Sequence, residues 1–199
     1  MSRAGEVFEN PVTGERTVVR LGTDETKGEL LVVDLYVRPG GAVAGEHIHP
    51  AITESFTVLR GRVGFRLDGR EDIAAPGRRL QVPPGVRHEW WNAGDEEAHV
   101  LVEIRPAARF EEMIGNLFGL AQDGKTDAKG MPNLLQLALI AQQFDDVIRF
   151  TKPPWAVQRL LFAVLAPIAR AVGYRGSYAA YLTRPASAVV PVEPWPRPI

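Results

Sequence analysis

The sequence contains no cysteine among its 199 residues. This absence excludes disulfide bridges, thiolate zinc sites, iron–sulfur clusters and cysteine nucleophiles. An excess of either charge is also missing, because 23 basic and 24 acidic residues leave a formal net charge of −1. A dedicated nucleic-acid-binding protein carries a basic surplus, so the charge balance predicts no nucleic-acid partner.

Long apolar runs are missing as well. The first ten residues, MSRAGEVFEN, have no apolar stretch behind Arg3 and do not look like a secretory signal. A mostly apolar stretch lies at 155–172, but Arg159, Pro167 and Arg170 interrupt it, so we expect no transmembrane segment. The sequence therefore predicts a cytoplasmic protein.

Glycine and proline are plentiful, and they separate short β-rich runs in the first half of the chain. Residues 30–37 read LLVVDLYV, and residues 62–67 alternate apolar and polar side chains. Asp68-Gly69 follows directly and is a favourable hairpin turn, because both residue types tolerate a positive φ. Such runs between frequent turns are typical of an antiparallel β-sandwich or barrel.

The apolar period changes to about 3.6 after Pro106, which predicts helices. One helix is expected from Phe110 to about Gly124, and a second over 132–148, before Lys152-Pro153-Pro154 ends it. The last fifteen residues hold five prolines and are expected to be extended or disordered. We therefore predict a mainly β chain with a β-barrel domain at 1–106, a helical appendage at 107–184 and a Pro-rich extended tail at 185–199.

Three of the four histidines lie in two short segments. His47 and His49 are one residue apart, so on a strand both imidazoles project from one face. Glu54 follows after a short bend, and His88 comes just after a Pro-Pro-Gly turn at the start of another expected strand. Imidazoles with a carboxylate suit Fe(II), Mn(II), Ni(II), Cu(II) or Zn(II). The pattern predicts a metal site.

These two segments, residues 41–61 and 77–92, resemble the two sequence motifs of the cupin superfamily. The resemblance as a whole covers about residues 30–106. The resemblance implies a jelly-roll β-barrel in which one divalent ion binds to both segments, and it makes a homodimer the expected assembly. It does not cover the helical appendage and does not name a reaction. The matching positions are Gly41, His47, His49, Glu54 and Gly61 in the first motif and Gly77, Pro83, Gly85, His88 and Asn92 in the second, and the implied ligands are His47, His49, Glu54 and His88.

Strand parity adds a set of expected pocket residues. The side chains that share a face with Glu54 or His88, or that alternate inward on the next strand, would make an apolar, aromatic cavity for a small organic molecule, although the same residues could simply fill the barrel core. A second catalytic acid or base is not evident, since Tyr36, Glu89 and Glu103 are candidates by position only, and His99 is expected at the surface of a strand. The expected pocket residues are Phe56, Val58, Phe65, Trp90 and Asn92.

Two function classes follow from this reading. The first is a metal-dependent enzyme, dioxygenase-like, acting on a small apolar or aromatic molecule at the open coordination positions of Fe, Mn, Zn or Ni, with Fe or Mn favoured for redox chemistry. The second is a non-catalytic cupin that binds or senses a small ligand and uses its helical appendage for dimer or partner contacts.

The end of the chain differs in charge from the rest. From residue 152 onward there are six basic residues and one acidic residue, Glu193, among several aromatic side chains. This composition allows contact with a membrane surface or an acidic partner. We favour the simpler expectation that these helices pack on the barrel or on a second subunit.

Overall fold

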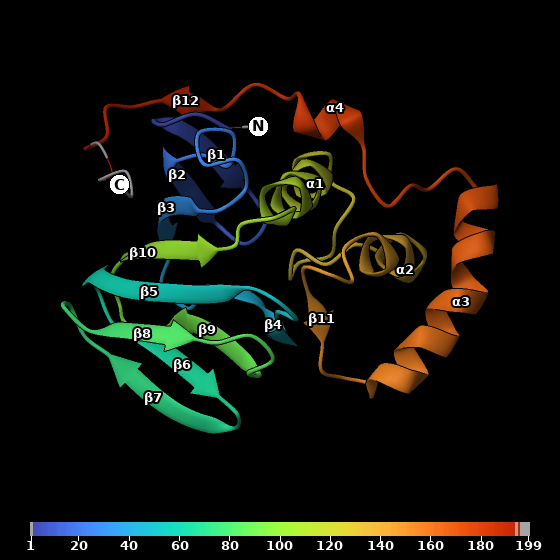
Figure 1. The fold of residues 1–199 in the computed structure, drawn as a ribbon, viewed down its shortest axis with the longest axis horizontal. Helices are drawn as coiled ribbons and strands as arrows, with labels where there is room; N and C mark the ends of the chain where they lie inside the picture. Colours follow the sequence, from blue (N-terminus) through green and yellow to red (C-terminus); the bar gives the residue numbers. More distant parts are fainter. Residues whose placement is uncertain (1, 194, 196–199) are drawn as a thin grey trace.

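The chain folds into a two-sheet β-barrel followed by helices (Figure 1), which confirms the predicted fold class. The computed structural model describes residues 2–193 and 195. In this part of the chain the strands of the barrel precede all the helices. These strands are β1 (Glu6–Asn10), β2 (Glu15–Leu21), β3 (Leu31–Val37), β4 (Ala42–Ile48), β5 (Thr53–Arg60), β6 (Val63–Leu67), β7 (Arg70–Ala74), β8 (Arg79–Val82), β9 (His88–Asn92) and β10 (Ala98–Arg105).

The strands form two antiparallel sheets. One sheet has the order β12-β1-β2-β3-β10-β5-β8, and the other has the order β11-β4-β9-β6-β7. Each sheet thus ends in a short strand from the C-terminal half, β11 (Arg149–Phe150) or β12 (Ala188–Val189). The expected hairpin at Asp68-Gly69 is confirmed, because Leu67 pairs with Arg70 and both turn residues have a positive φ.

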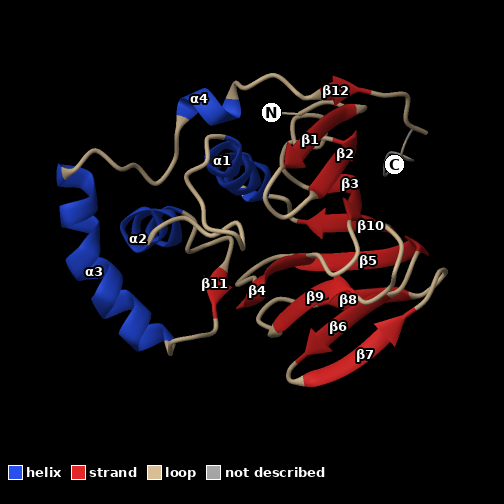
Figure 2. Ribbon diagram, turned by 180° about the vertical axis from the view of Figure 1, so that it is seen from behind, coloured by secondary structure: helices blue, strands red, loops and turns tan. Residues whose placement is uncertain are grey.

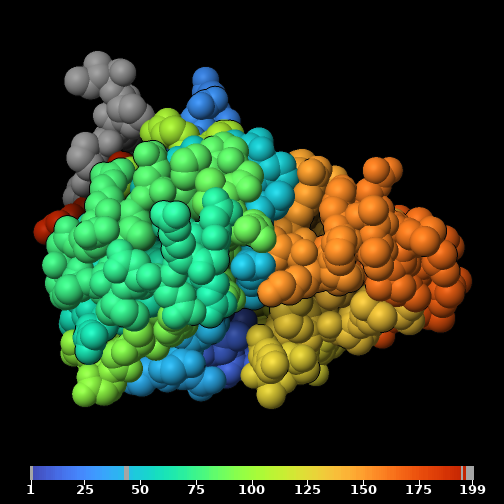
Figure 3. Space-filling view, turned by 90° about the horizontal axis from the view of Figure 1, so that it is seen from below, coloured from blue at the N-terminus to red at the C-terminus, as the bar shows by residue number. Residues whose placement is uncertain are grey.

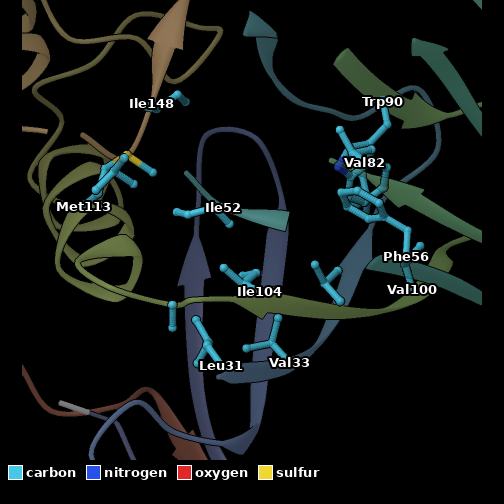
Figure 4. Close-up of a cluster of buried hydrophobic side chains, with 14 of the residues drawn as sticks. Leu31, Val33, Ile52, Phe56, Val82, Trp90, Val100, Ile104, Met113 and Ile148 are labelled. Carbon is cyan, nitrogen blue, oxygen red and sulfur yellow. The ribbon is translucent and has the colours of Figure 1, made fainter. Parts of the chain in front are cut away.

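The inner faces of the two sheets meet in an aromatic cluster. The ring of Phe56, on β5, lies 5.5 Å from Phe65 and 5.9 Å from Trp90 between centroids, and the latter two belong to the other sheet. Valines from β5, β6 and β10 are fully or almost fully buried around these rings. Figure 4 shows that the same core continues toward Met113 and Ile148, which lie outside the barrel strands.

Among the described residues, four helices follow the barrel: α1 (Phe110–Gln122), α2 (Leu134–Gln143), α3 (Trp155–Ala171) and α4 (Ala179–Leu182). The first ends at Asp123, and Gly124 adopts a positive φ, as expected for a glycine just beyond a helix. The second begins where the side chain of Asn133 accepts hydrogen bonds from the backbone N–H groups of Leu135 and Gln136.

The expected extent of the second helix, to residue 148, is wrong. The helix ends at Gln143, and the chain then enters the extended strand β11, which pairs with β4. Phe144, Val147 and Ile148 are nevertheless buried, as their apolar character indicated. Their burial comes from packing on the barrel rather than from one continuous helix face.

The helices do not all pack on the barrel. Side chains of α1 and of the segment after α2 belong to the barrel core, whereas α3 packs on α2 through a separate cluster of Leu139, Ala166 and Ala169. Figure 2 shows α3 as the element farthest from the barrel strands. None of the helices in the described residues has the length and apolar character needed to cross a membrane.

The described part of the tail is extended and lies on the barrel. Its strand β12 pairs with β1, and Trp195 packs against a second buried cluster made of Leu21, Leu30, Val32 and Leu101. Residue 194 and residues 196–199 of the predicted tail lie outside the described residues. The predicted boundaries at 106 and 184 fall between elements, close to the end of β10 and the end of α4.

The shared core makes Phe144 a test of whether the barrel and the appendage unfold together. Phe144 is fully buried, so Phe144→Ala should lower the free energy of unfolding by about 3–5 kcal/mol. Urea unfolding should show one transition, shifted equally when followed by tryptophan fluorescence and by far-UV circular dichroism. Leu134→Ala, at a half-exposed position, is the control and should change little. Two separate transitions would mean that the cores are independent.

Glu15 gives the fold a pH dependence. Its carboxyl is buried and accepts a hydrogen bond from Thr13, and burial raises its pKa from 4.5 to about 7. The folded protein therefore binds more protons than the unfolded chain between these values, and stability should fall as the pH rises from about 4.5 to about 7. Glu15→Gln should remove this loss, adding up to about 3 kcal/mol at pH 8 and much less at pH 4. Thermal melts across pH would test this, with the exposed Glu29→Gln as control; equal effects of Glu15→Gln at both pH values would contradict it.

Candidate metal centre

Strands of both sheets bring the four predicted ligand residues together. His47 is on β4 and pairs directly with His88, the first residue of β9. His49 follows just after the end of β4, and Glu54 is on β5 in the other sheet. None of the four residues is more than 6% exposed, and one candidate ligand atom from each lies within 4.8 Å of all the others.

The distances show a tight group of nitrogen and oxygen atoms. Nε2 of His47 lies 3.2 Å from Nε2 of His49. One carboxylate oxygen of Glu54 lies 2.9 Å from Nε2 of His88 and 3.3 Å from Nε2 of His49. All three imidazoles therefore turn the same ring nitrogen toward a common point.

Backbone carbonyls fix this orientation. Nδ1 of His47 lies 2.7 Å from the carbonyl oxygen of Gly45, Nδ1 of His49 lies 2.6 Å from that of Val147, and Nδ1 of His88 lies 3.0 Å from that of Val86. Because a carbonyl oxygen only accepts, each Nδ1 donates, and in a neutral ring Nε2 keeps its lone pair. In metalloproteins the same kind of hydrogen bond, from the ring nitrogen that faces away from the metal, holds metal-binding histidines in place.

The electrostatics of the cluster also suit a cation. Burial lowers the pKa of His47 to about 3, with a further contribution from the neighbouring histidines, so this ring is neutral at pH 7. Burial alone would raise the pKa of Glu54, but the charges and hydrogen bonds of His49 and His88 outweigh it and hold the pKa below its ordinary range. Burial likewise disfavours protonation of His49, and the attraction of Glu54 overcomes it, which raises the pKa of His49. The buried carboxylate thus requires a positive partner, either a proton on His49 or a metal ion.

The donor set fits a divalent metal. Three imidazole nitrogens and one carboxylate oxygen are ligands for Fe, Mn, Ni, Cu or Zn, and they leave one or two positions open on an ion that accepts five or six. The four side chains could hold such an ion with small adjustments, because they already face one point.

The helical appendage contributes directly to this site, which sequence reasoning missed. Val147 supplies the carbonyl for His49, Phe150 pairs with His47 through β11, and the ring of Phe110 lies 5.6 Å from that of His49. A backbone carbonyl has no residue type to mark it in a sequence. The available signal was the apolar character of Phe144, Val147 and Ile148, which fall within the helix expected over 132–148.

Most of the predicted pocket residues lie in the core. Phe56, Val58, Phe65 and Trp90 are buried in the main hydrophobic cluster. Asn92 is buried too. Its side-chain N–H groups donate to the carbonyls of Val37 and Glu96, and its side-chain oxygen accepts from the backbone N–H of Gly94. Contact between these residues and a substrate stays a prediction.

The remaining candidate residues bind other groups. Glu89 pairs with Arg66 and Glu103 pairs with Arg79. Nε2–H of His99 donates to the Asp34 carboxylate at 2.7 Å, and the His99 ring stacks on Tyr36. His99 is therefore not among the grouped side chains, in agreement with its expected place on the surface of a strand.

Two curated proteins match about a third of this chain. A curated protein from Streptomyces cyaneus named polyketide synthase CurC is 36% identical over 72 residues, which cover 36% of this chain and 46% of that protein. Protein SchB from Streptomyces halstedii is 36% identical over 72 residues, covering 36% of this chain and 51% of SchB. The match thus spans about half the length of these curated relatives.

A solved structure and a family model also match part of this chain. The crystal structure of a predicted oxalate decarboxylase from Thermotoga maritima superposes with a TM-score of 0.46 and 21% identity, over 51% of this chain and 91% of that chain. The family model described as the cupin domain matches residues 34–104, which contain all four side chains of the cluster. Residues 34–104 of this chain are a cupin domain.

Proposed function

We propose that this chain is a metal-dependent enzyme whose divalent ion is held by the four clustered side chains. The observation that carries the proposal is the convergence of three histidine Nε2 atoms on one point. In each ring the other nitrogen, Nδ1, already donates its proton in a hydrogen bond to a backbone carbonyl. Such an ion, when bound, would polarise a substrate oxygen or, as Fe or Mn, support reaction with dioxygen. The proposed ligands are His47, His49, Glu54 and His88.

The protein's own residues would orient and shield this chemistry. The carbonyls of Gly45, Val86 and Val147 keep each imidazole turned toward the ion. The carboxylate of Glu54 offsets part of the ion's charge. Burial of the ligands excludes bulk water, which strengthens these electrostatic interactions.

We further propose a small apolar or aromatic substrate. The Phe110 ring beside His49 and the aromatic cluster of Phe56, Phe65 and Trp90 give the barrel interior an apolar, aromatic character. One relative is named a polyketide synthase, and polyketides carry carbonyl and phenol oxygens that bind divalent ions. A polyketide-derived aromatic compound in an oxygen-using, dioxygenase-like reaction is therefore the proposed activity.

A non-catalytic ligand-binding role is the second candidate. It is favoured by the direct contact between the appendage and His49 through Val147 and Phe110. A ligand at the ion would disturb these contacts and so change the surface that the helices present. In that case the ligand would be bound and released unchanged.

Metal content tests the site itself. Protein purified without chelator should hold about one equivalent of a divalent metal, measured by elemental analysis. His49→Ala and the nearly isosteric Glu54→Gln should each weaken binding more than about 100-fold, because they remove a ligand rather than a supporting group. His99→Ala is the matched control, since that histidine lies outside the cluster, and it should keep its metal.

Circular dichroism would establish that each variant is folded. A folded wild-type protein that takes up no divalent ion, even after reconstitution with Fe, Mn, Ni and Zn, would contradict the metal site. Equal loss of metal in His99→Ala would also contradict this assignment of the ligands.

Oxygen consumption separates the two candidate functions. Protein loaded with Fe(II) or Mn(II) should consume dioxygen with a 1,3-diketone or a polyhydroxylated aromatic compound faster than the free metal does, and Glu54→Gln should lose this excess rate. A compound that raises the melting temperature of the metal-loaded protein but is recovered unchanged, with no oxygen uptake, would support the ligand-binding role instead.

A further inference from the structure

Helix α3 has two apolar faces, and the described part of the chain buries one of them and leaves the other exposed. Its inner face buries Phe162, Ala166 and Ala169, the alanines against α2. Its outer face carries a stripe of large apolar side chains at intervals of three or four residues, so they lie in a row along the helix. These residues, 50–71% exposed, are Val157, Leu160, Val164, Ile168 and, just after the helix, Val172.

The stripe lies on a projecting part of the molecule. Figures 1 and 2 place α3 at the edge of the fold, with α2 between it and the barrel. In the space-filling view the C-terminal helices project beyond the barrel (Figure 3). The small exposed residues between the large ones, Ala156, Ala163 and Ala171, leave the ridge free of polar groups.

The charged residues of α3 and of the chain at its two ends are all positive. Residues 147–192 contain no aspartate or glutamate. Within the described residues, Lys152, Arg159 and Arg175 form no ion pair, and Arg170 bonds only the neutral side chain of Gln142. Two of these four cations are on α3 and the other two flank its ends, and none of the four pairs with a carboxylate in the part of the chain that the structure describes.

We propose that the outer face of α3 binds the surface of a membrane rich in anionic lipid headgroups. A helix with an exposed apolar stripe and a cationic margin lies in the plane of such a surface, with its apolar side chains among the outer parts of the acyl chains. The cations then contact lipid phosphates, which supply the negative charge that residues 147–192 lack. Trp155, at the start of the helix, is a residue type that favours this interface.

A second copy of this chain, bound through its own α3, is the alternative partner for this face. A second copy would bring the same cations to the contact and no acidic residue of α3 to pair with them. An isologous contact repeats the same patch on both subunits, so it cannot supply the missing charge. Charge complementarity therefore favours the anionic lipid surface.

Vesicle binding by the full chain tests the proposal. The protein should co-sediment with phosphatidylcholine vesicles containing about one quarter phosphatidylglycerol, about tenfold more strongly than with phosphatidylcholine alone. Leu160→Glu should weaken binding at least about tenfold, because it places a charge in the apolar stripe. Arg159→Gln with Arg170→Gln should abolish most of the preference for the anionic vesicles. Ile73→Glu, which adds the same charge at an exposed apolar position on β7, is the control and should bind as the wild type does.

The replaced side chains at positions 159, 160 and 170 are exposed, so these variants should melt at the wild-type temperature. Failure of the wild type to bind anionic vesicles would overturn the proposal, as would equal loss of binding in Ile73→Glu and Leu160→Glu. Sedimentation velocity without lipid tests the alternative, self-association through this face. If the wild type is a dimer that Leu160→Glu dissociates, and if it binds no vesicles, the face is a dimer interface.

Discussion

The hydrogen bonds from the Nδ1–H groups of the three clustered histidines to backbone carbonyls constrain how the chain around the site is arranged. Each imidazole of the cluster must donate Nδ1–H to a carbonyl before its Nε2 can face the common point. Two of the carbonyls, those of Gly45 and Val86, lie two residues before the histidines they orient. The third belongs to Val147, 98 residues away from His49. The barrel by itself therefore leaves His49 without its partner, and the appendage is part of the site.

This requirement accounts for the path of the chain after α2. The carbonyl of Val147 reaches His49 because the helix ends at Gln143 and the chain turns to run antiparallel to β4. The backbone N–H of Thr151 continues the pairing by donating to the carbonyl of Glu46 at 3.2 Å. Phe144 and Ile148 enter the barrel core at the same place, so hydrophobic burial holds the segment where the hydrogen bond needs it. Packing and site geometry thus depend on the same few residues.

The sequence predicts the interior of the site better than its surroundings. Strand parity was enough to put His47 and His49 on one face, and burial at alternate positions of β9 places His88, Trp90 and Asn92 together as expected. The end of α2 and the strand β11 could not be predicted, because the pairing of a two-residue strand depends on a partner about a hundred residues earlier. Local periodicity carries no such information, and it read the buried Val147 and Ile148 as helical.

The outer face of α3 does not arise from the demands of folding. A helix that is apolar on nearly all sides is normally enclosed by other elements. Here side chains of α1 and of the segment after α2 already join the barrel core. Trp195 packs against the second buried cluster, which contains Leu21 and Leu101. Replacing Leu160 or Val164 by a polar residue would remove no buried packing contact, because neither side chain belongs to a buried cluster. The stripe is therefore a surface feature whose exposure to water costs free energy, and an apolar partner that covers it would remove that cost. Negative charge at the boundary of such a partner would in addition balance the four neighbouring cations.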